Sequence, residues 1–336
     1  MFRNVVAIER ALGTGIIISS SVPISHRVQK RIRAFVEEYE SVLSRFRADS
    51  LVSRMASAEH GGEFEFPEWA GPLFVLYSEF YAATRGAFDA CIGADLLALG
   101  YNNSVQFVPE LAASASSNIG SWANYCRSLP IAWSDISQDS GSATLCTNQP
   151  VQLDFGAAGK GYFVDLVTQI IKEDLGSDSP ADFDFLVNAG GDMRACFSEE
   201  NDQIKVALEN PFDTTQAVAV ASIASGALCA SSAARRRWNV KDKNGFESNL
   251  IATHLINALD GIPACDLCAS WAYVPSKTCD FPTAYADALA TALFVSQESD
   301  LQKIVQTTGA EFAVMLPNKT LSKTRAFPAH FFAESI

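Results

Sequence analysis

The sequence has 336 residues, of which 48% are hydrophobic and 19% are charged, and its formal net charge is −13 at pH 7. This composition suffices for a large core, and no apolar run reaches about 18 residues, so we expect a globular chain without a membrane-spanning helix. The acidic balance argues against a nucleic-acid partner, because duplex binding requires a basic face. The first residues lack the basic and apolar regions of a secretory signal, so we expect a cytoplasmic location for the chain as given.

Hydrophobic periodicity predicts the elements of the first half of the chain. Residues 5–19 alternate loosely between apolar and small side chains, which indicates a strand or hairpin with a glycine turn. The apolar spacing then becomes helical and predicts helices over 28–43 and 68–84. Residues 110–125 are rich in Ser, Ala and Gly, so we expect a flexible connector there. Short strands are expected after it, at 131–133, 143–146 and 151–155.

The second half mixes short strands with helices. A helix is expected over 160–173, followed by a solvated connector at 174–184. The final third contains two further predicted helices, over 283–296 and 301–307. Strands are predicted at 185–188, 204–208, 217–223, 250–256, 271–274 and 311–316. Because strands and helices do not alternate regularly, the pattern favours an α+β fold, with mixed or antiparallel sheets flanked by helices, over a doubly wound parallel sheet.

A glycine-rich loop, Leu-Asp-Phe-Gly-Ala-Ala-Gly-Lys-Gly at 153–161, is a candidate anion-binding site. Asp154 ends a predicted strand, and the glycines allow the backbone to bend closely around a ligand. Lys160 stands at the start of a helix, whose free N–H groups favour anions. An ordinary strand-to-helix turn with a surface lysine explains the same residues, since the loop matches neither a Walker A sequence nor a dinucleotide fingerprint.

Four further patterns could carry chemistry, and each also has an ordinary structural explanation. Asp287 and Thr291 are four residues apart in an Ala-rich helix, so they share a face and offer oxygen ligands that suit Mg²⁺. Asn-Ala-Gly-Gly-Asp at 188–192 and Gly-Ala-Phe-Asp at 86–89 could place carboxylates beside a ligand. His254 is a candidate proton acceptor. The alternatives are a threonine bonded to its own helix, two plain turns and a structural histidine.

Two smaller groups of residues are of interest. The arginines at 235–237 form the one basic cluster of an acidic chain, although a solvated turn is the commoner explanation. Of the eight cysteines, Cys265, Cys268 and Cys279 could in principle hold zinc. A second closely spaced pair and a nearby histidine are missing, so we expect mostly buried, reduced thiols.

Together, these motifs resemble those of the ApbE family, the FAD:protein FMN transferases. The matching segments, in the order of the family, lie at 12–14, 43–50, 86–89, 153–161, 188–192 and 286–293. The resemblance extends from about residue 10 to residue 316, and the last segment, Ala-Asp-Ala-Leu-Ala-Thr-Ala-Leu, matches the family pattern without a change. It implies one ApbE-like domain over 1–336, with two possibly interwoven lobes and FAD in a cleft between them.

The resemblance also implies roles for individual residues. Mg²⁺ would be held by the side chains of Asp287 and Thr291 and by the backbone carbonyl of Ala157. His254 would take the proton from an acceptor hydroxyl. The residues that would contact FAD are Leu12, Gly13, Thr14, Phe46, Ala87, Phe88, Asp89, Asp154, Lys160, Asp192 and Ile256.

The activity implied by the resemblance is the Mg²⁺-dependent transfer of FMN from FAD to a threonine or serine hydroxyl of a target protein, with release of AMP. With water as the acceptor, the same residues would act as an FAD pyrophosphatase, and a non-catalytic FAD-binding protein is a further alternative. The chain departs from the family pattern at three places. An acid and a proline after His254 are replaced by Asn257 and Ala258, Thr-Ser-Gly is replaced by Ala-Ser-Ser at 230–232, and an alanine is replaced by Gly159.

Overall fold

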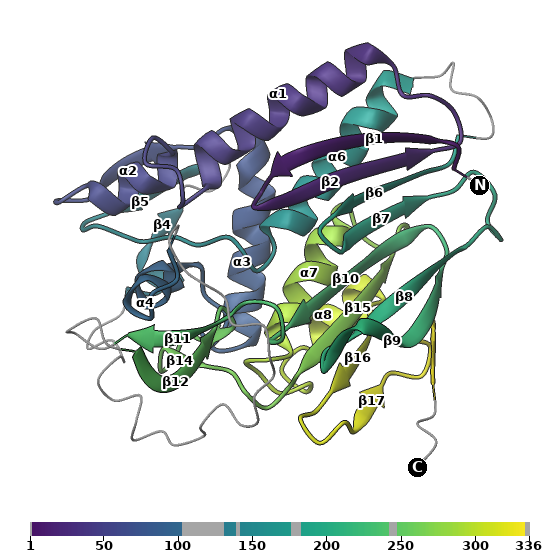
Figure 1. Ribbon diagram of the computed structural model, residues 1–336. Helices are drawn as coiled ribbons and strands as arrows, with labels where there is room; N and C mark the ends of the chain where they lie inside the picture. The colour runs from purple at the N-terminus through teal and green to yellow at the C-terminus, as the bar shows by residue number, and fades with distance from the viewer. Residues whose placement is uncertain (1, 103–130, 139–141, 176–182, 242–246, 333–336) are drawn as a thin grey trace.

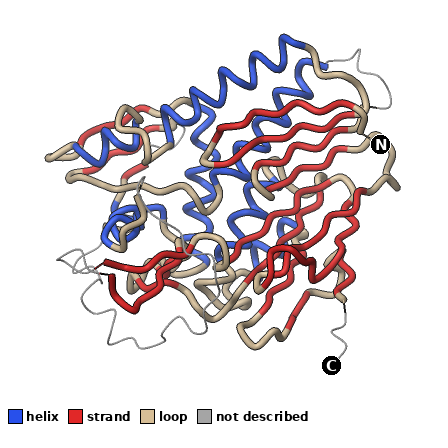
Figure 2. The backbone as a smooth tube through the Cα atoms, viewed as in Figure 1, coloured by secondary structure: helices blue, strands red, loops and turns tan. Residues whose placement is uncertain are grey.

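The computed structural model describes residues 2–102, 131–138, 142–175, 183–241 and 247–332. Within these residues, the largest element is an eight-stranded sheet in which every neighbouring pair of strands is antiparallel (Figures 1 and 2). Its strands, in spatial order, are β1 (Asn4–Ala11), β2 (Thr14–Ser20), β6 (Phe185–Ala189), β7 (Asp192–Cys196), β10 (Gly226–Ser232), β15 (Ala269–Pro275), β16 (Glu311–Met315) and β17 (Leu321–Lys323).

Helices cover one face of this sheet. The helix α1 (His26–Leu43) begins at the cap residue Ser25, whose hydroxyl accepts the N–H of Val28, and its buried residues recur at helical spacing. Beside it lies α6 (Gly159–Leu175), which contacts β6 and β7, and then α7 (Pro282–Ala292), which contacts β10 and β15. The alanines of α7 are buried, so this helix approaches both α6 and the sheet closely.

A smaller sheet packs on part of the opposite face. It consists of β18 (Ala329–Phe331), β9 (Asp213–Ile223) and β8 (Ile204–Asn210), in that order. Because side chains alternate along a strand, β10 sends Ala227 and Cys229 toward the helices and Leu228 toward the small sheet. Leu228 and Trp271 therefore belong to a second apolar cluster between the two sheets. This arrangement separates the core into two layers.

The remaining helices and strands complete the fold (Figure 1). They are α2 (Leu51–Ser57), α3 (Gly71–Ala83), α4 (Gly93–Ala98), α8 (Gln302–Thr308), the strands β3 (Gly62–Glu65), β4 (Ser137–Gln138) and β5 (Thr144–Thr147), and the hairpins β11 (Arg237–Lys241) with β12 (Glu247–Thr253) and β13 (Ile256–Asn257) with β14 (Ile262–Pro263). A third apolar cluster, which includes Leu96, Tyr101 and Trp238, joins α4 to the β11–β12 hairpin. No described helix is long and apolar enough to cross a bilayer.

The structure confirms the α+β fold and most predicted elements. The alternation at 5–19 is the β1–β2 hairpin, and the predicted helices correspond to α1, α3, α6, α7 and α8. The predicted strands at 204–208, 217–223 and 311–316 correspond to β8, β9 and β16. The expected connector at 110–125 lies outside the described residues, as do 176–182 of the one expected at 174–184. Residues 174 and 175 still belong to α6.

Two predicted strands are wrong, and a third is interrupted. Residues 131–133 lead into a 3₁₀ turn at Trp133–Asp135, and 151–155 form no strand. The latter segment is extended, but its N–H groups reach single carbonyls, at Met55 and Ala90, instead of a neighbouring strand. The strand predicted at 250–256 breaks after Thr253, so His254 lies on a bend. Alternation predicts an extended backbone, whereas a strand also needs a partner strand beside it.

Candidate functional site

The residues nominated by sequence line one cavity. Its volume is about 470 Å³, and it lies where the β1–β2 turn, the start of α6, one face of α7 and the segment after β12 meet. Its lining includes all of the nominated residues: Leu12, Gly13, Thr14, Phe46, Ala87, Phe88, Asp89, Asp154, Ala157, Lys160, Asp192, His254, Ile256, Asp287 and Thr291. The fold therefore brings together side chains that are almost 280 residues apart in the chain.

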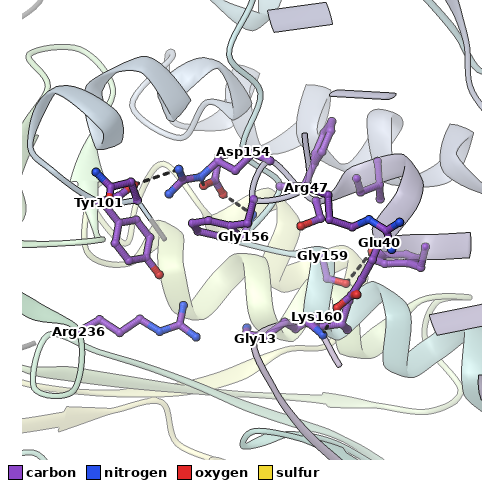
Figure 3. A pocket seen from close by; sticks show the side chains of 17 residues that line it. Gly13, Glu40, Arg47, Tyr101, Asp154, Gly156, Gly159, Lys160 and Arg236 are labelled. Carbon is purple, nitrogen blue, oxygen red and sulfur yellow. Dashed lines mark hydrogen bonds and ion pairs between the residues drawn. The ribbon is translucent and has the colours of Figure 1, made fainter. Parts of the chain in front are cut away.

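A second cavity, of about 520 Å³, adjoins the first. The two cavities share part of their lining, including Gly13, Asp154, Lys160 and Arg236. Figure 3 shows Tyr101 and Arg236 on one side of the second cavity and Glu40 and Lys160 on the other. Ligand sites commonly occupy roughly 300–1,000 Å³, so the joined space suits a ligand as large as a dinucleotide.

Lys160 lies between two buried carboxylates. Its Nζ atom is 2.6 Å from the carboxylate of Asp192 and 3.5 Å from that of Asp287. The same carboxylate of Asp287 also accepts the backbone N–H of Gly161 at 2.9 Å. Asp192 lies at the start of β7, so three elements meet at this cluster.

The electrostatics of this cluster favour an additional cation. Burial and the neighbouring Asp192 raise the pKa of Asp287, and Lys160 and the N–H of Gly161 offset only part of that rise. Burial opposes the charge of Lys160, but the two carboxylates outweigh it and raise the pKa of the ammonium group. One ammonium therefore faces two acids, and a further cation would favour the charged form of Asp287.

Three residues beside this cluster carry oxygen atoms of the kinds that magnesium accepts. Asp287 and Thr291 stand on successive turns of α7, and Ala157 lines the same cavity. Carboxylate, hydroxyl and carbonyl oxygens are ligands that Mg²⁺ accepts, and it usually completes its shell with water and substrate phosphates. Among the described residues, no group of three or more His, Cys, Asp or Glu side chains could hold a metal ion. The donor set at 287, 291 and 157 thus suits a cation that depends on its substrate for further ligands.

Asp154 braces the glycine-rich loop. Its carboxylate forms an ion pair with Arg45 and accepts the N–H of Gly156 at 2.7 Å. The Arg45 guanidinium lies 4.2 Å from the ring centroid of Phe46 and 4.9 Å from that of Tyr101. Side chains of Arg45 and Asp154 are only 7% and 13% exposed, so this pair acts mainly within the protein. The role of Arg45 could not be predicted from the sequence, because its partner Asp154 is 109 residues away.

The β1–β2 turn projects into the cavity in a left-handed conformation. Leu12 and Gly13 have φ of 54° and 70°, and a non-glycine residue adopts this region at an energetic cost. The backbone N–H of Leu12 donates to the Glu40 carboxylate of α1 at 2.6 Å. Glu40 therefore holds the turn in place. Sequence reasoning missed it, because a glutamate on a helix usually faces solvent.

His254 is neutral at physiological pH. Burial and the positive charges of Arg236 and Lys160 lower its pKa to about 3. Its Nδ1 atom is buried and has no hydrogen-bond partner among the described residues. A neutral imidazole with an unsatisfied nitrogen is able to accept a proton.

The basic cluster divides into three environments. Arg235 forms an ion pair with Glu209, Arg236 lines both cavities, and Arg237 is buried. The solvated turn that sequence favoured is therefore wrong for Arg237, which is buried on β11. The sequence could not single out Arg236, because three adjacent arginines look alike until the connection between β10 and β11 sets the direction of each side chain.

Asp89 and the glycine turn of β6–β7 mainly shape the cavity wall. The carboxylate of Asp89 accepts the N–H groups of Cys91 and Trp133 at 2.7 and 3.1 Å. Gly190, with φ of 66°, approaches Thr14 so closely that an added Cβ would lie 2.6 Å from the Thr14 hydroxyl. This close approach requires glycine and brings the β1–β2 and β6–β7 turns together.

Comparison with known proteins agrees with this geometry. A model of the ApbE family matches residues 12–316. Among solved structures, the chain is similar to the ApbE protein of Thermotoga maritima, with 21% identity, a TM-score of 0.72 and coverage of 96% of this chain and 98% of that one. It is also similar to the flavin transferase ApbE from Vibrio cholerae, with 17% identity, a TM-score of 0.70 and coverage of 96% and 97%.

A third similar structure is the apo form of the flavinyl transferase ApbE from Pseudomonas stutzeri, with 22% identity, a TM-score of 0.67 and coverage of 96% of both chains. At these identities the likeness shows that the fold is shared over nearly the whole length of each chain. No curated protein matches the sequence.

Proposed function

The chain belongs to the ApbE family, and from this premise we propose that it is an Mg²⁺-dependent FAD:protein FMN transferase. Three observations support the proposal. The joined cavities suit a dinucleotide, Lys160 and Arg236 supply positive charge beside them, and the oxygen donors of Asp287 and Thr291 suit magnesium. Two of the similar solved structures carry the names flavin transferase and flavinyl transferase.

The proposed reaction joins a protein hydroxyl to the flavin-side phosphorus of FAD. The acceptor oxygen forms a new bond to that phosphorus, and the bond from this phosphorus to the bridging oxygen breaks. AMP leaves with the bridging oxygen, and the hydroxyl proton passes to a base. With water in place of the protein hydroxyl, the same exchange yields FMN and AMP.

Residues of the chain have distinct roles in this proposal. Asp287, Thr291 and the carbonyl of Ala157 would hold the metal ion, which when bound neutralises charge on the diphosphate and on the departing AMP. Lys160 and Arg236 would bind the diphosphate oxygens. His254 would accept the hydroxyl proton. Arg236 and Lys160 both lower the pKa of His254, so the imidazole is in the neutral form that this role requires.

The single observation that carries the proposal is the Asp192–Lys160–Asp287 cluster. Two buried acids share one ammonium group at the wall of a cavity large enough for a dinucleotide. A cation that arrives with an anionic ligand would give the second acid a partner of its own.

Substitution of Asp287 tests the proposal. We expect Asp287→Asn to lower AMP release from FAD and flavin attachment to an acceptor peptide by at least about a hundredfold, because a neutral amide cannot neutralise the cation. The matched control is Asp280→Asn, an exposed acid just before α7, which should leave both rates unchanged.

The assay uses purified protein, FAD, Mg²⁺ and a library of threonine-containing peptides, with AMP and peptide-bound flavin measured in the same samples. AMP without peptide-bound flavin from any peptide would identify a pyrophosphatase. Stable FAD binding without AMP would identify a non-catalytic flavin-binding protein. Unchanged AMP release by Asp287→Asn would refute the assigned metal site.

A further inference from the structure

A third cavity, of about 570 Å³, opens on the face of the central sheet opposite to α6 and α7. It shares part of its wall with the first cavity, namely Thr14, Gly190, Ala230, Ser231, Ser232 and Arg235. The first and third cavities therefore lie on opposite faces of the central sheet at the end of β10, and they meet at these shared residues. The proposed reaction assigns no role to the residues that line only the third cavity.

The floor of this cavity is a row of side chains across four strands. Ile17, Asn188, Met193 and Leu228 pair in succession from β2 through β6 and β7 to β10, so they lie on the same face of the sheet. Leu228 is buried beneath the small sheet, Met193 is partly buried and Ile17 is 47% exposed. The small sheet thus covers only one end of this row, in which Asn188 is the one polar residue and accepts the N–H of Gly191.

The small sheet ends at the side of this cavity. In the strand order β18–β9–β8, β8 is an edge strand, and no other described strand pairs with it on its outer side. Four successive residues of β8, from Val206 to Glu209, line the cavity. Because successive side chains point to opposite faces, a cavity lined by all four borders the edge of the strand. An edge of this kind presents N–H and C=O groups that another strand can pair with.

We propose that the third cavity binds the acceptor segment of the target protein as an extended strand added to β8. Such a strand would continue the small sheet by one position and cover Met193 and Ile17. Its hydroxyl-bearing residue would lie at the shared wall, near Ser231 and Ser232, and there reach the flavin-side phosphorus in the first cavity. This inference rests on the transfer function proposed above.

An ion pair lies at the junction between the cavities. Arg235 lines both cavities and donates two hydrogen bonds to the Glu209 carboxylate at the end of β8, and their side chains are 68% and 35% exposed. This two-point contact holds Glu209 at the rim of the third cavity. The backbone of an added strand would provide most of the binding, and pockets for alternate side chains would provide selectivity.

Two substitutions on one face of the sheet separate acceptor binding from FAD chemistry. We expect Ile17→Glu to slow flavin transfer to a subsaturating peptide by about tenfold, because the carboxylate would be desolvated beneath the added strand. It should leave AMP release without peptide unchanged. Val5→Glu is the matched control, since Val5 is 66% exposed on β1, shares the face of Ile17 and lies outside the cavity.

Backbone methylation of the acceptor tests the strand pairing directly. The best peptide of the library is resynthesised with a single N-methyl group at each position in turn. Alternate positions should lose about tenfold in transfer rate, while the positions between them lose little, because only every second N–H of an added strand faces β8. Sedimentation of the wild-type protein and Ile17→Glu shows whether a second copy covers the row.

Each other outcome has a definite meaning. Equal rates for Ile17→Glu and Val5→Glu, or a methylation profile without alternation, would overturn the strand model while flavin transfer stands. Loss of acceptor-independent AMP release in Ile17→Glu would assign the row to the FAD site. If Ile17→Glu sediments differently from the wild-type protein, a second copy of the chain covers the row of side chains. If the wild-type protein never labels a peptide, the transferase proposal fails, and the docking inference fails with it.

Discussion

The hydroxyl of Thr291 on α7 has a hydrogen-bonding neighbour on the central sheet. Its Oγ1 atom lies 3.1 Å from the Oγ atom of Ser231, which belongs to β10. If Thr291 uses a lone pair for a metal ion, its proton needs another acceptor, and Ser231 is placed to provide it. Partners of this kind orient metal ligands, and their loss typically costs about 10–100-fold in affinity. Sequence comparison shows only that Ser231 is the retained serine of an altered Thr-Ser-Gly segment.

Removal of this partner should weaken metal binding. We expect Ser231→Ala to raise the dissociation constant for Mn²⁺, used as a spectroscopic substitute for Mg²⁺, by about tenfold in the presence of FAD. Electron paramagnetic resonance measures free Mn²⁺ independently of turnover. The control is Ser270→Ala, since Ser270 on β15 also joins the sheet to α7, through the carbonyl of Ala290 at 2.6 Å, but lies outside the cavity. Equal effects of the two variants would assign Ser231 a structural role.

The packing of α6 against α7 places the proposed metal ligands beside the lysine loop. Gly161 lies so close to α7 that an added Cβ would be 2.3 Å from the carbonyl oxygen of Thr283 and 2.8 Å from the Cβ of Asp287. Gly159, in the same loop, has more space, because its added Cβ would be 3.5 Å from the Tyr39 hydroxyl. The two glycines therefore have different functions in the same element.

A pair of alanine substitutions separates these functions. Gly161→Ala should lower the free energy of unfolding by about 2 kcal/mol or more, because a side chain in a filled interface forces the helices apart. Gly159→Ala should leave stability unchanged or raise it by up to about 1 kcal/mol, because alanine favours the helix. Urea denaturation of both variants measures the difference. A Gly161→Ala variant as stable as the wild type would show that α6 and α7 are not in close contact.

At the scale of the whole molecule, Asp165 links the helical layer to the sheet. It lies on α6, accepts the N–H groups of Thr283 and Ala284 at 2.9 Å, and accepts the Thr283 hydroxyl at 2.6 Å. Arg194 of β7 approaches it at 3.6 Å. Burial nonetheless outweighs these favourable contacts and raises the pKa of Asp165 to about 6.

This raised pKa predicts a pH-dependent stability. The folded chain binds the Asp165 proton more tightly than the unfolded chain, so this group lowers the free energy of unfolding as pH rises from about 4 to about 6. The loss is about 3 kcal/mol for a shift of roughly two pKa units. Asp165→Asn removes the titration, so its stability relative to the wild type should rise by about that amount over the same range. Urea denaturation at several pH values measures it, and a flat difference would contradict the dominance of burial.

All of the site residues named from the sequence line one cavity, whereas two of the predicted strands are wrong. Each nominated residue belongs to a short motif, and short motifs depend on local geometry that the sequence specifies, such as the helical spacing that aligns Asp287 with Thr291. The strands β7 and β10 were missed, because small residues such as Ala227, Cys229 and Ala230 show no clear alternation. The segment 151–155 alternates but has no partner strand.

The sequence by itself determined the α+β class through its periodicity, and its motifs identified the ApbE family and, through that resemblance, the residues proposed to bind a dinucleotide and a metal ion. Only the tertiary structure showed which other residues hold these site residues in place. Glu40, Arg45 and Ser231 contact partners far away in the chain, and Arg236 lines both cavities. The cluster of Lys160 with two acids and the edge position of β8 among the described strands likewise exist only after distant strands and helices have packed together, since burial and proximity are properties of the folded chain.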